Sequence, residues 1–161
     1  MVIHTEVPAP IRALFPFHVH EYALPAGVMR YVDEGSGTPV VLLHGNPTWS
    51  FFYRRLIPLL RTQRRVIAPD HLGCGLSDKP QHYRYSLVNH IANLESLLTW
   101  LDVGPVDLVV HDWGGAIGMG WAVRHPDLVR RIVVLNTAAF LSPHVPLRIA
   151  AGKLPRLGEW A

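Results

Sequence analysis

The sequence of 161 residues has little cysteine, little charge and no long apolar run. Its single cysteine, Cys74, cannot form an internal disulfide, as expected in a reducing cytoplasm. No apolar run reaches the 18 or so residues of a membrane span. The N-terminus, with a histidine, a glutamate and two prolines in its first ten residues, is unlike a signal peptide. The sequence therefore predicts a cytoplasmic protein with no membrane partner.

Charged residues make up 17% of the chain, and Lys plus Arg exceed Asp plus Glu by 15 to 12. Apart from Arg61, Arg64 and Arg65, which are expected to be solvated, the charges are scattered. No basic stripe interleaved with aromatic residues is present, so nucleic acid is not an expected partner despite the basic pI. A hydrophobic content of 49%, without repeats or low-complexity tracts, is typical of one globular domain.

Short apolar runs alternate with helical patterns along the chain. Strands are predicted at His18 to Tyr22, Val28 to Asp33, Val40 to Leu43, Val66 to Pro69, Val106 to Val110 and Ile132 to Asn136. Helices are predicted at about Phe51 to Leu60, Leu87 to Trp100 and Gly115 to Arg124, with Ser86 as the N-cap of the second. This order predicts an α/β fold with a doubly wound, mostly parallel sheet.

An aspartate stands where many α/β enzymes place a nucleophilic serine. Asp112, in the sequence His111 to Gly115, follows a predicted strand, and two glycines permit a tight turn into a closely packed helix. A carboxylate is ionised at neutral pH and can attack without a base. It suits sp3 carbons that carry a leaving group, as in halides, epoxides and strained lactones. The alternative is that Asp112 only caps the helix.

A second loop, His44 to Trp49, follows the strand Val40 to Leu43. It has the position of an oxyanion loop, in which the backbone N–H of Asn46 pairs with that of Trp113. Both residues also carry side-chain N–H donors that can hold a halide. Two hydrogen bonds to a charged group contribute roughly 3 to 6 kcal/mol. The alternatives are that Asn46 only forms a turn with Pro47 and that Trp113 is an ordinary helix residue.

Three segments resemble the haloalkane dehalogenases of the α/β-hydrolase fold: His44 to Ser50, Pro69 to Pro80 and Val109 to Gly115. The resemblance covers the chain from about Phe17 onward. It implies that Asp112 is the nucleophile and that Asn46 and Trp113 bind the halide. It further implies a covalent alkyl-enzyme ester that water hydrolyses to an alcohol. The implied partners are a small hydrophobic substrate and water, with no cofactor and no metal.

Other functions remain open alternatives. The segments Leu135 to Phe140 and Gly158 to Trp160 also resemble the β-lactone decarboxylases of olefin biosynthesis. An epoxide hydrolase is the next alternative, although a glutamate in place of Asn46 would suit it better. The last is a non-catalytic binding module on a hydrolase scaffold. Halogen preference and oligomeric state are not indicated.

The resemblance covers only the N-terminal part of such an enzyme. Residues 1–141 are interpreted as the N-terminal part of the core domain, and residues 142–161 as the start of a truncated helical cap. The histidine base and second acid of the family are expected later than this sequence reaches, so neither is assigned. The segment Ile132 to Leu135 is expected to form an uncovered apolar edge. A longer gene product is expected, and this chain alone should fold poorly.

Five further positions have mainly structural interpretations. His18 and His20 lie on one face of a strand, which alone does not indicate a metal. Cys74, between two glycines, is expected to be a small loop residue and not a nucleophile. Ser77 is expected to cap or turn its loop, because no strand immediately precedes it. His44 is expected to support its loop and not to act as the base.

Overall fold

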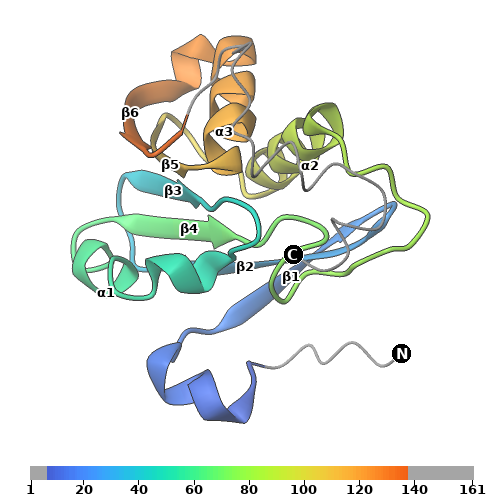
Figure 1. Cartoon of the computed structure of the whole chain (residues 1–161). Helices are drawn as coiled ribbons and strands as arrows, with labels where there is room; N and C mark the ends of the chain where they lie inside the picture. The colour runs from blue at the N-terminus through green and yellow to red at the C-terminus, as the bar shows by residue number, and fades with distance from the viewer. Residues whose placement is uncertain (1–6, 138–161) are drawn as a thin grey trace.

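The computed structural model describes residues 7–137, which form one six-stranded sheet with helices on both faces (Figure 1). The spatial order of the strands is β1-β2-β4-β3-β5-β6. Their bounds are Val19–Leu24, Gly27–Glu34, Pro39–Leu43, Arg65–Pro69, Val106–His111 and Val129–Leu135 in chain order. Each lies within a few residues of its predicted position.

The sheet is parallel from β4 to β6 and antiparallel at its beginning. Strands β1 and β2 form a hairpin whose second strand begins at Gly27, with φ of 149°, and β2 then pairs antiparallel with β4. Strand β3 lies between β4 and β5 and is parallel to both. Its side chains from Val40 to Leu43 are buried, as predicted for strands covered on both faces. The predicted doubly wound, mostly parallel sheet is therefore confirmed.

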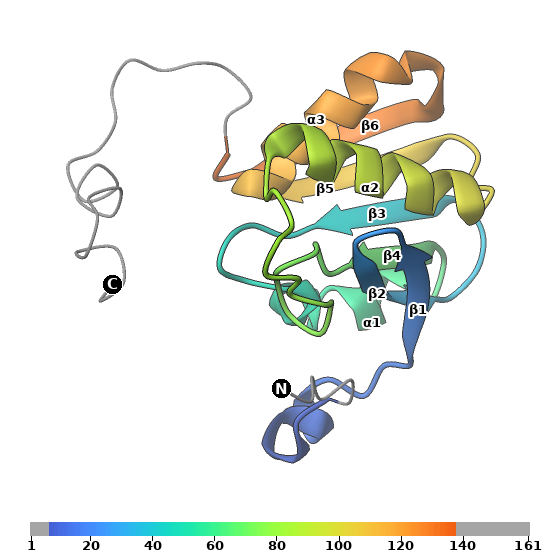
Figure 2. The ribbon, with the colours of Figure 1, turned by 90° about the vertical axis from the view of Figure 1, so that its right-hand side faces the viewer.

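Figure 2 shows helices α2 and α3 over one face of the sheet and α1 near the opposite face. Helix α2, Leu87–Trp100, has the predicted bounds, and the Ser86 hydroxyl accepts the Asn89 N–H at 3.3 Å as its cap. Helix α3, Trp113–Arg124, begins two residues before its predicted start. None of the helices in residues 7–137 has both the length and the apolar composition that a membrane-spanning helix needs.

The predicted helix over residues 51–60 is wrong. The segment folds instead as a 3₁₀ helix, η2 (Ser50–Tyr53), followed by the single turn α1 (Ile57–Leu60). Pro58 stands at the second position of α1, where the missing N–H is tolerated. In a continuous helix the ring of Pro58 would meet the carbonyl of Arg54, so the chain must break upstream.

The cluster Arg61, Arg64 and Arg65 is not simply solvated. Arg61 pairs with Glu34 at 2.9 Å and Arg65 with Asp33 at 2.7 Å, while Arg64 forms an ion pair with Asp107. Each arginine therefore faces a carboxylate, so the cluster is not a free basic patch.

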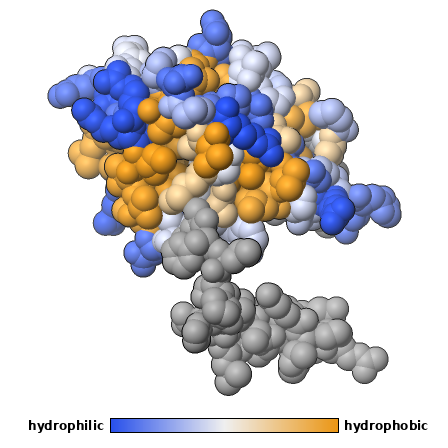
Figure 3. Space-filling model, turned by 90° about the horizontal axis from the view of Figure 1, so that it is seen from above, coloured by the Kyte–Doolittle hydropathy of each residue, from blue (hydrophilic) through white to orange (hydrophobic). Residues whose placement is uncertain are grey.

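Strand β6 forms one edge of the described sheet, and its side chains are largely exposed. Ile132, Val133 and Val134 are 38%, 47% and 52% exposed. Figure 3 shows hydrophobic areas among hydrophilic ones on the face seen from above. The predicted uncovered edge is thus confirmed for these residues. The interpretations that fall on residues 138–161, including the start of a cap, lie outside the described residues.

Candidate active site

The two predicted site loops meet at the carboxyl ends of neighbouring strands. Strands β3 and β5 are parallel neighbours, with Leu43 opposite Val110. The loop containing Asn46 leaves β3 just after this pair, and Asp112 follows β5 at the same edge. In open α/β sheets this edge is where ligands bind.

Asp112 occupies a strained turn between β5 and α3. Its φ of 51° and ψ of −125° lie outside the regions that ordinary residues favour, and such strain is concentrated at functional sites. The backbone carbonyl of Asp112 accepts the Gly115 N–H at 2.9 Å and the Thr137 hydroxyl at 2.5 Å. The turn is thus fixed from two elements, α3 and the segment after β6.

Glycines around this turn are required by close approach. A Cβ on Gly114 would collide with the Leu43 carbonyl, and one on Gly115 with the Thr137 side chain. A Cβ on Gly45 would collide with the side chain of Asp112 itself. The glycines therefore let α3 pack onto β3 and let the first loop approach the carboxylate.

The Asp112 carboxylate is held by the other loop and not by its own helix. Its Oδ1 accepts the backbone N–H of Asn46 at 2.9 Å. It makes no capping hydrogen bond to α3, and its backbone lies outside the extended region typical of an N-cap. The alternative that Asp112 only caps the helix is therefore wrong.

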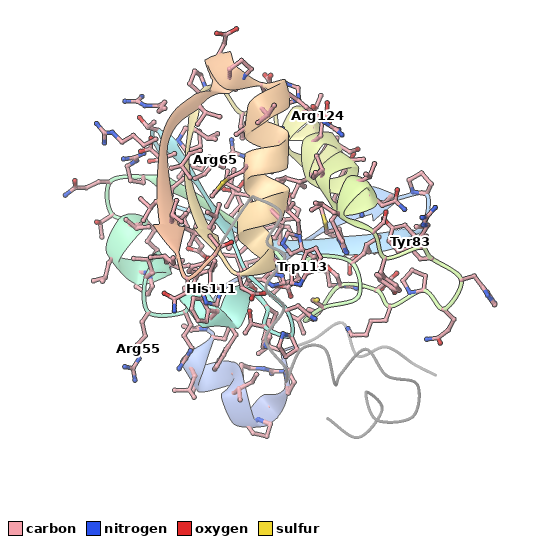
Figure 4. All side chains as sticks on the ribbon, turned by 45° about the horizontal axis from the view of Figure 1, so that its top comes forward. Arg55, Arg65, Tyr83, His111, Trp113 and Arg124 are labelled. Atoms are coloured by element: carbon pink, nitrogen blue, oxygen red, sulfur yellow. The ribbon has the colours of Figure 1, made fainter. Side chains whose placement is uncertain are left out.

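The structure places the two other predicted site residues beside this carboxylate. Asn46 contributes its backbone N–H and has an exposed side chain, and its peptide bond to Pro47 is cis. Trp113 is the first residue of α3 and is 51% exposed (Figure 4). Both residues border one pocket, described below, and Trp113 also borders the open space beside Asp112.

His44 supports the first loop, as expected from the sequence. It is fully buried, and its Nε2 accepts the His71 backbone N–H at 3.0 Å. The ring proton therefore lies on Nδ1, which donates to the Gly45 carbonyl at 2.8 Å. Burial lowers the pKa of His44, so the ring stays neutral. Both ring nitrogens are occupied, which leaves none to act as a base.

A buried carboxylate, Asp70, orders the second layer of the site. Its oxygens accept the backbone N–H groups of Ser50 at 2.7 Å and Leu76 at 2.8 Å. Burial raises the pKa of Asp70. No role for this residue was inferred from the sequence, although it lies in the segment Pro69 to Pro80 that carries the resemblance. The signal available was an acidic residue directly after a buried strand.

Ser77 fastens its loop to strand β2. Its hydroxyl donates to the Asp70 carbonyl at 2.6 Å and accepts the Arg30 N–H at 2.7 Å. The Arg30 guanidinium, itself buried, donates to the Leu76 carbonyl and to Asp78. Ser77 is thus a bridge between β2 and the segment after β4, which is more than the local turn expected.

Cys74 and the pair His18 and His20 keep their structural interpretations. Burial raises the pKa of the Cys74 thiol, which favours the protonated, unreactive form. The rings of His18 and His20 pack edge to face at 4.5 Å. Among residues 7–137, no group of three or more histidine, cysteine, aspartate or glutamate residues could hold a metal ion.

A pocket of about 460 Å³ adjoins the two loops. Its walls come from the segment after β4, the start of α2 and the start of α3. Gly45, Asn46 and Trp113 form the part nearest the carboxylate, and His71 and His90 lie in the wall formed by the segment after β4 and α2.

Known proteins match this chain along most of its length. A family model described as alpha/beta hydrolase fold matches residues 38–159. The cis-3-alkyl-4-alkyloxetan-2-one decarboxylase of Shewanella oneidensis is 50% identical over 141 residues, covering 85% of this chain and 44% of that protein. Haloalkane dehalogenase 2 of Mycobacterium tuberculosis is 41% identical, covering 80% and 45%.

Among solved structures, the haloalkane dehalogenase DatA from Agrobacterium tumefaciens C58 matches with a TM-score of 0.77 at 34% identity, over 88% of this chain and 50% of that one. The chain spans about half the length of the curated relatives that it matches.

Proposed function

Because the chain belongs to the α/β-hydrolase fold family, we propose that it forms the nucleophile-bearing part of an enzyme that displaces halide from haloalkanes. A carboxylate oxygen of Asp112 attacks the sp3 carbon, the carbon–halogen bond breaks, and an alkyl ester of Asp112 forms. The observation that supports this proposal best is the aspartate in a strained turn, with its carboxylate held by the Asn46 N–H. Its partners are a small hydrophobic substrate and water.

The halide leaves toward Asn46 and Trp113 in this proposal. The Asn46 amide and the Trp113 indole both carry N–H donors, and both residues border the space beside Asp112 or its adjoining pocket. Two such hydrogen bonds to a developing anion contribute roughly 3 to 6 kcal/mol. At about 1.4 kcal/mol per decade, this is a factor of roughly a hundred to ten thousand in rate.

Hydrolysis of the ester requires a base that activates water. Among the described residues we assign none. His44 has both nitrogens occupied, and the His111 ring stacks on Phe52 at 4.3 Å. The haloalkane dehalogenase resemblance places the base in a histidine that follows strand β6 in the chain, and we propose the same for this protein.

A second candidate is the decarboxylation of a β-lactone. The higher identity to the oxetan-2-one decarboxylase than to the dehalogenase favours it. The same attack by Asp112 on the sp3 ring carbon next to the ring oxygen would break that C–O bond and release a carboxylate. Loss of CO₂ with departure of Asp112 would then give an alkene, and the aspartate would be restored.

The reaction products that the full protein encoded by the gene forms from each substrate distinguish the two candidates. We expect 1-bromohexane to give bromide and hexanol with turnover. In the Asp112→Asn variant bromide release should fall at least about a thousandfold, because an amide is a poor nucleophile. The variant should still fold, since the Asn oxygen can accept the Asn46 N–H. Asp102→Asn is the matched control, because Asp102 also has a positive φ, of 48°, and is exposed far from the site.

Other outcomes contradict the dehalogenase proposal in distinct ways. Alkene and CO₂ from a cis-3,4-dialkyl oxetan-2-one, without bromide from 1-bromohexane, would establish the second candidate. Diol from an epoxide without bromide would establish an epoxide hydrolase. An intact-mass spectrum without an alkyl adduct, and no turnover of any of the three substrates, would favour a binding module.

A further inference from the structure

Strands β5 and β6 end side by side next to the proposed nucleophile. His111 is paired with Leu135, so Asp112 and Asn136 are the next residues of the two parallel strands. Both have a positive φ, 51° and 42°, so both strands end in a turn at the same edge of the sheet. After the turn at Asn136, the hydroxyl of Thr137 donates to the backbone carbonyl of Asp112 at 2.5 Å.

The Thr137 side chain packs closely against the turn that carries Asp112. It occupies the place that a Cβ on Gly115 would take, because that Cβ would collide with the Oγ1 of Thr137. The Asp112 carbonyl also accepts the Gly115 N–H, which belongs to α3. Thr137 therefore holds this carbonyl from outside α3.

A carbonyl that is held in place also fixes the N–H of the same peptide group. The peptide bond between Asp112 and Trp113 is trans, since the only cis bond among residues 7–137 precedes Pro47. In a planar trans peptide the C=O and the N–H point in opposite directions. Thr137 therefore sets the direction of the Trp113 N–H. As the first N–H of α3, it has no helix carbonyl to bind.

This hydrogen bond matters because the turn is strained. A residue outside the favoured backbone regions costs of order 1 to 3 kcal/mol and persists only where its surroundings hold it. Asp112 has such a backbone, and Gly114 and Gly115 nearby offer little resistance to rotation. Without the Thr137 hydroxyl, the peptide group between Asp112 and Trp113 can rotate toward a less strained position.

We propose that Thr137 is a positioning residue that aims the Trp113 backbone N–H at the ester of Asp112 during its hydrolysis. This inference rests on the proposed alkyl ester. In that step water adds to Cγ of Asp112, the electron pair of the C=O bond moves onto Oδ1, and one water proton passes to the proposed histidine base. The carbonyl then re-forms, the alcohol leaves with that proton, and the restored carboxyl group releases the other. Oδ1 already accepts the Asn46 N–H, and the Trp113 N–H is the second donor.

The two chemical steps should respond differently to the loss of this second donor. During alkylation the Asp112 carboxylate loses negative charge, so a donor aimed at Oδ1 does not lower the barrier. During hydrolysis an oxyanion develops on Oδ1, and each donor stabilises it. The effect of Thr137 should therefore fall on hydrolysis of the ester.

The test follows both steps with 1-bromohexane on the full protein that the gene encodes. In Thr137→Val, which removes the hydroxyl at nearly unchanged volume, hydrolysis should slow about tenfold, as expected for one lost hydrogen bond. Rapid-quench intact-mass spectra should show the alkyl adduct forming at the wild-type rate and then persisting. Thr137→Ser keeps the hydroxyl and should restore hydrolysis.

Thr62→Val is the matched control and should leave both steps unchanged. The Thr62 hydroxyl also donates to a backbone carbonyl, that of Leu59 at 3.0 Å, but it precedes β4 at the opposite edge of the sheet. Equal slowing of alkylation and hydrolysis in Thr137→Val would overturn the positioning role, because a loosened fold slows both. Unchanged hydrolysis in Thr137→Val would also overturn it.

A spectroscopic measurement examines the peptide group without the chemistry. Asp followed by Trp occurs once in this sequence, at Asp112 and Trp113, so carbonyl-carbon-13 aspartate with nitrogen-15 tryptophan labels this peptide bond. Its signal is identified by its loss in Trp113→Phe. The carbonyl signal should shift in Thr137→Val and stay in place in Thr137→Ser and Thr62→Val.

The same signal separates failure of this inference from failure of the proposed function. If the wild type releases no bromide from any substrate, the dehalogenase proposal fails, and the NMR signal alone decides whether Thr137 holds the peptide group. A shift in Thr137→Val would support that role, and an unshifted signal would overturn it.

Discussion

Strands β5 and β6 are paired neighbours with similar apolar sequences but opposite surroundings. Leu108 lies opposite Ile132, and Val110 lies opposite Val134. The two β5 residues are fully buried, whereas Ile132 and Val134 are 38% and 52% exposed. An apolar run therefore indicates a strand suited to burial, but its neighbours decide whether it is buried. The difference also places the chemistry, because the strained turn of Asp112 is at the end of the buried strand.

The largest expected difference between the two strands is in how much a substitution lowers the free energy of unfolding. In the full protein that the gene encodes, Leu108→Ala should lower the free energy of unfolding by about 2 to 5 kcal/mol, because it leaves a cavity in a packed core. Val133→Thr, at a position that is 47% exposed, should change it by less than about 0.5 kcal/mol. Urea unfolding measures both values, and equal losses would contradict the comparison. If Val133→Thr is costly in the full gene product, another segment covers β6 there.

The turn at the end of β5 should be the next most sensitive region. Gly114→Ala should cost about 1 to 3 kcal/mol, because its Cβ would collide with the Leu43 carbonyl of β3. Gly104→Ala is the matched control, since a Cβ at Gly104 meets nothing within 4 Å. Thermal unfolding of the two variants should differ clearly. Similar melting temperatures would show that α3 can move away from β3 without loss.

Stability should also depend on pH through the buried histidines. The pKa of His90 is lowered in the fold, so the unfolded chain binds a proton near pH 6.5 that the folded chain does not. The contribution of the neutral His90 ring to the free energy of unfolding is therefore present above pH 6.5. It is lost as the pH falls from 6.5 toward the lower pKa that His90 has in the folded chain. Between pH 7.5 and 5.5 the wild type should therefore lose up to about 1 kcal/mol more than His90→Gln.

The measurement is urea unfolding at the two pH values, with His82→Gln as the exposed control. If His90→Gln and wild type lose the same stability, the pKa of His90 is not lowered in the fold. Asp70 is present in all three proteins. Because His90 is one of the groups that lower the pKa of His71, the difference reports the titration of His90 together with its effect on His71.

The smallest effect on stability is expected at the edge strand, where solubility should change instead. Val133→Lys should alter the free energy of unfolding by less than about 0.5 kcal/mol, since its side chain is half exposed. It should reduce self-association of the 161-residue chain, because a lysine on an edge strand opposes pairing with another chain. Light scattering across a concentration series measures this. Unchanged scattering would locate the association elsewhere.

Much of the fold could be predicted because its signals are local. Helix α2 was predicted with its observed bounds from apolar spacing and the cap Ser86. The elbow at Asp112 was likewise visible in five consecutive residues. The prediction of one helix over residues 51–60 was wrong. The apolar content of this segment suits a helix, but Pro58 divides it into two short pieces.

The second layer of the site could not be predicted in the same way. The contact between His44 and the backbone of His71 joins two loops that only the β3–β4 pairing brings together. The unpaired Nε2 of His71 depends on α2 packing over that loop. Such features arise from strand order and burial, which a single sequence specifies only through the whole fold.

The strand order of the sheet also sets an order of events for folding. Strand β3 precedes both of its neighbours in the chain. The edge of β3 that pairs with β5, where Val41 lies opposite Leu108, therefore stays unpaired until β5 has been synthesised. On a ribosome that releases the chain from its N-terminus, the central strand would emerge with neither neighbour available. Non-local pairing of this kind slows folding. We therefore expect nascent chains that stop between β3 and β5 to bind chaperones until Val106 to His111 have been synthesised.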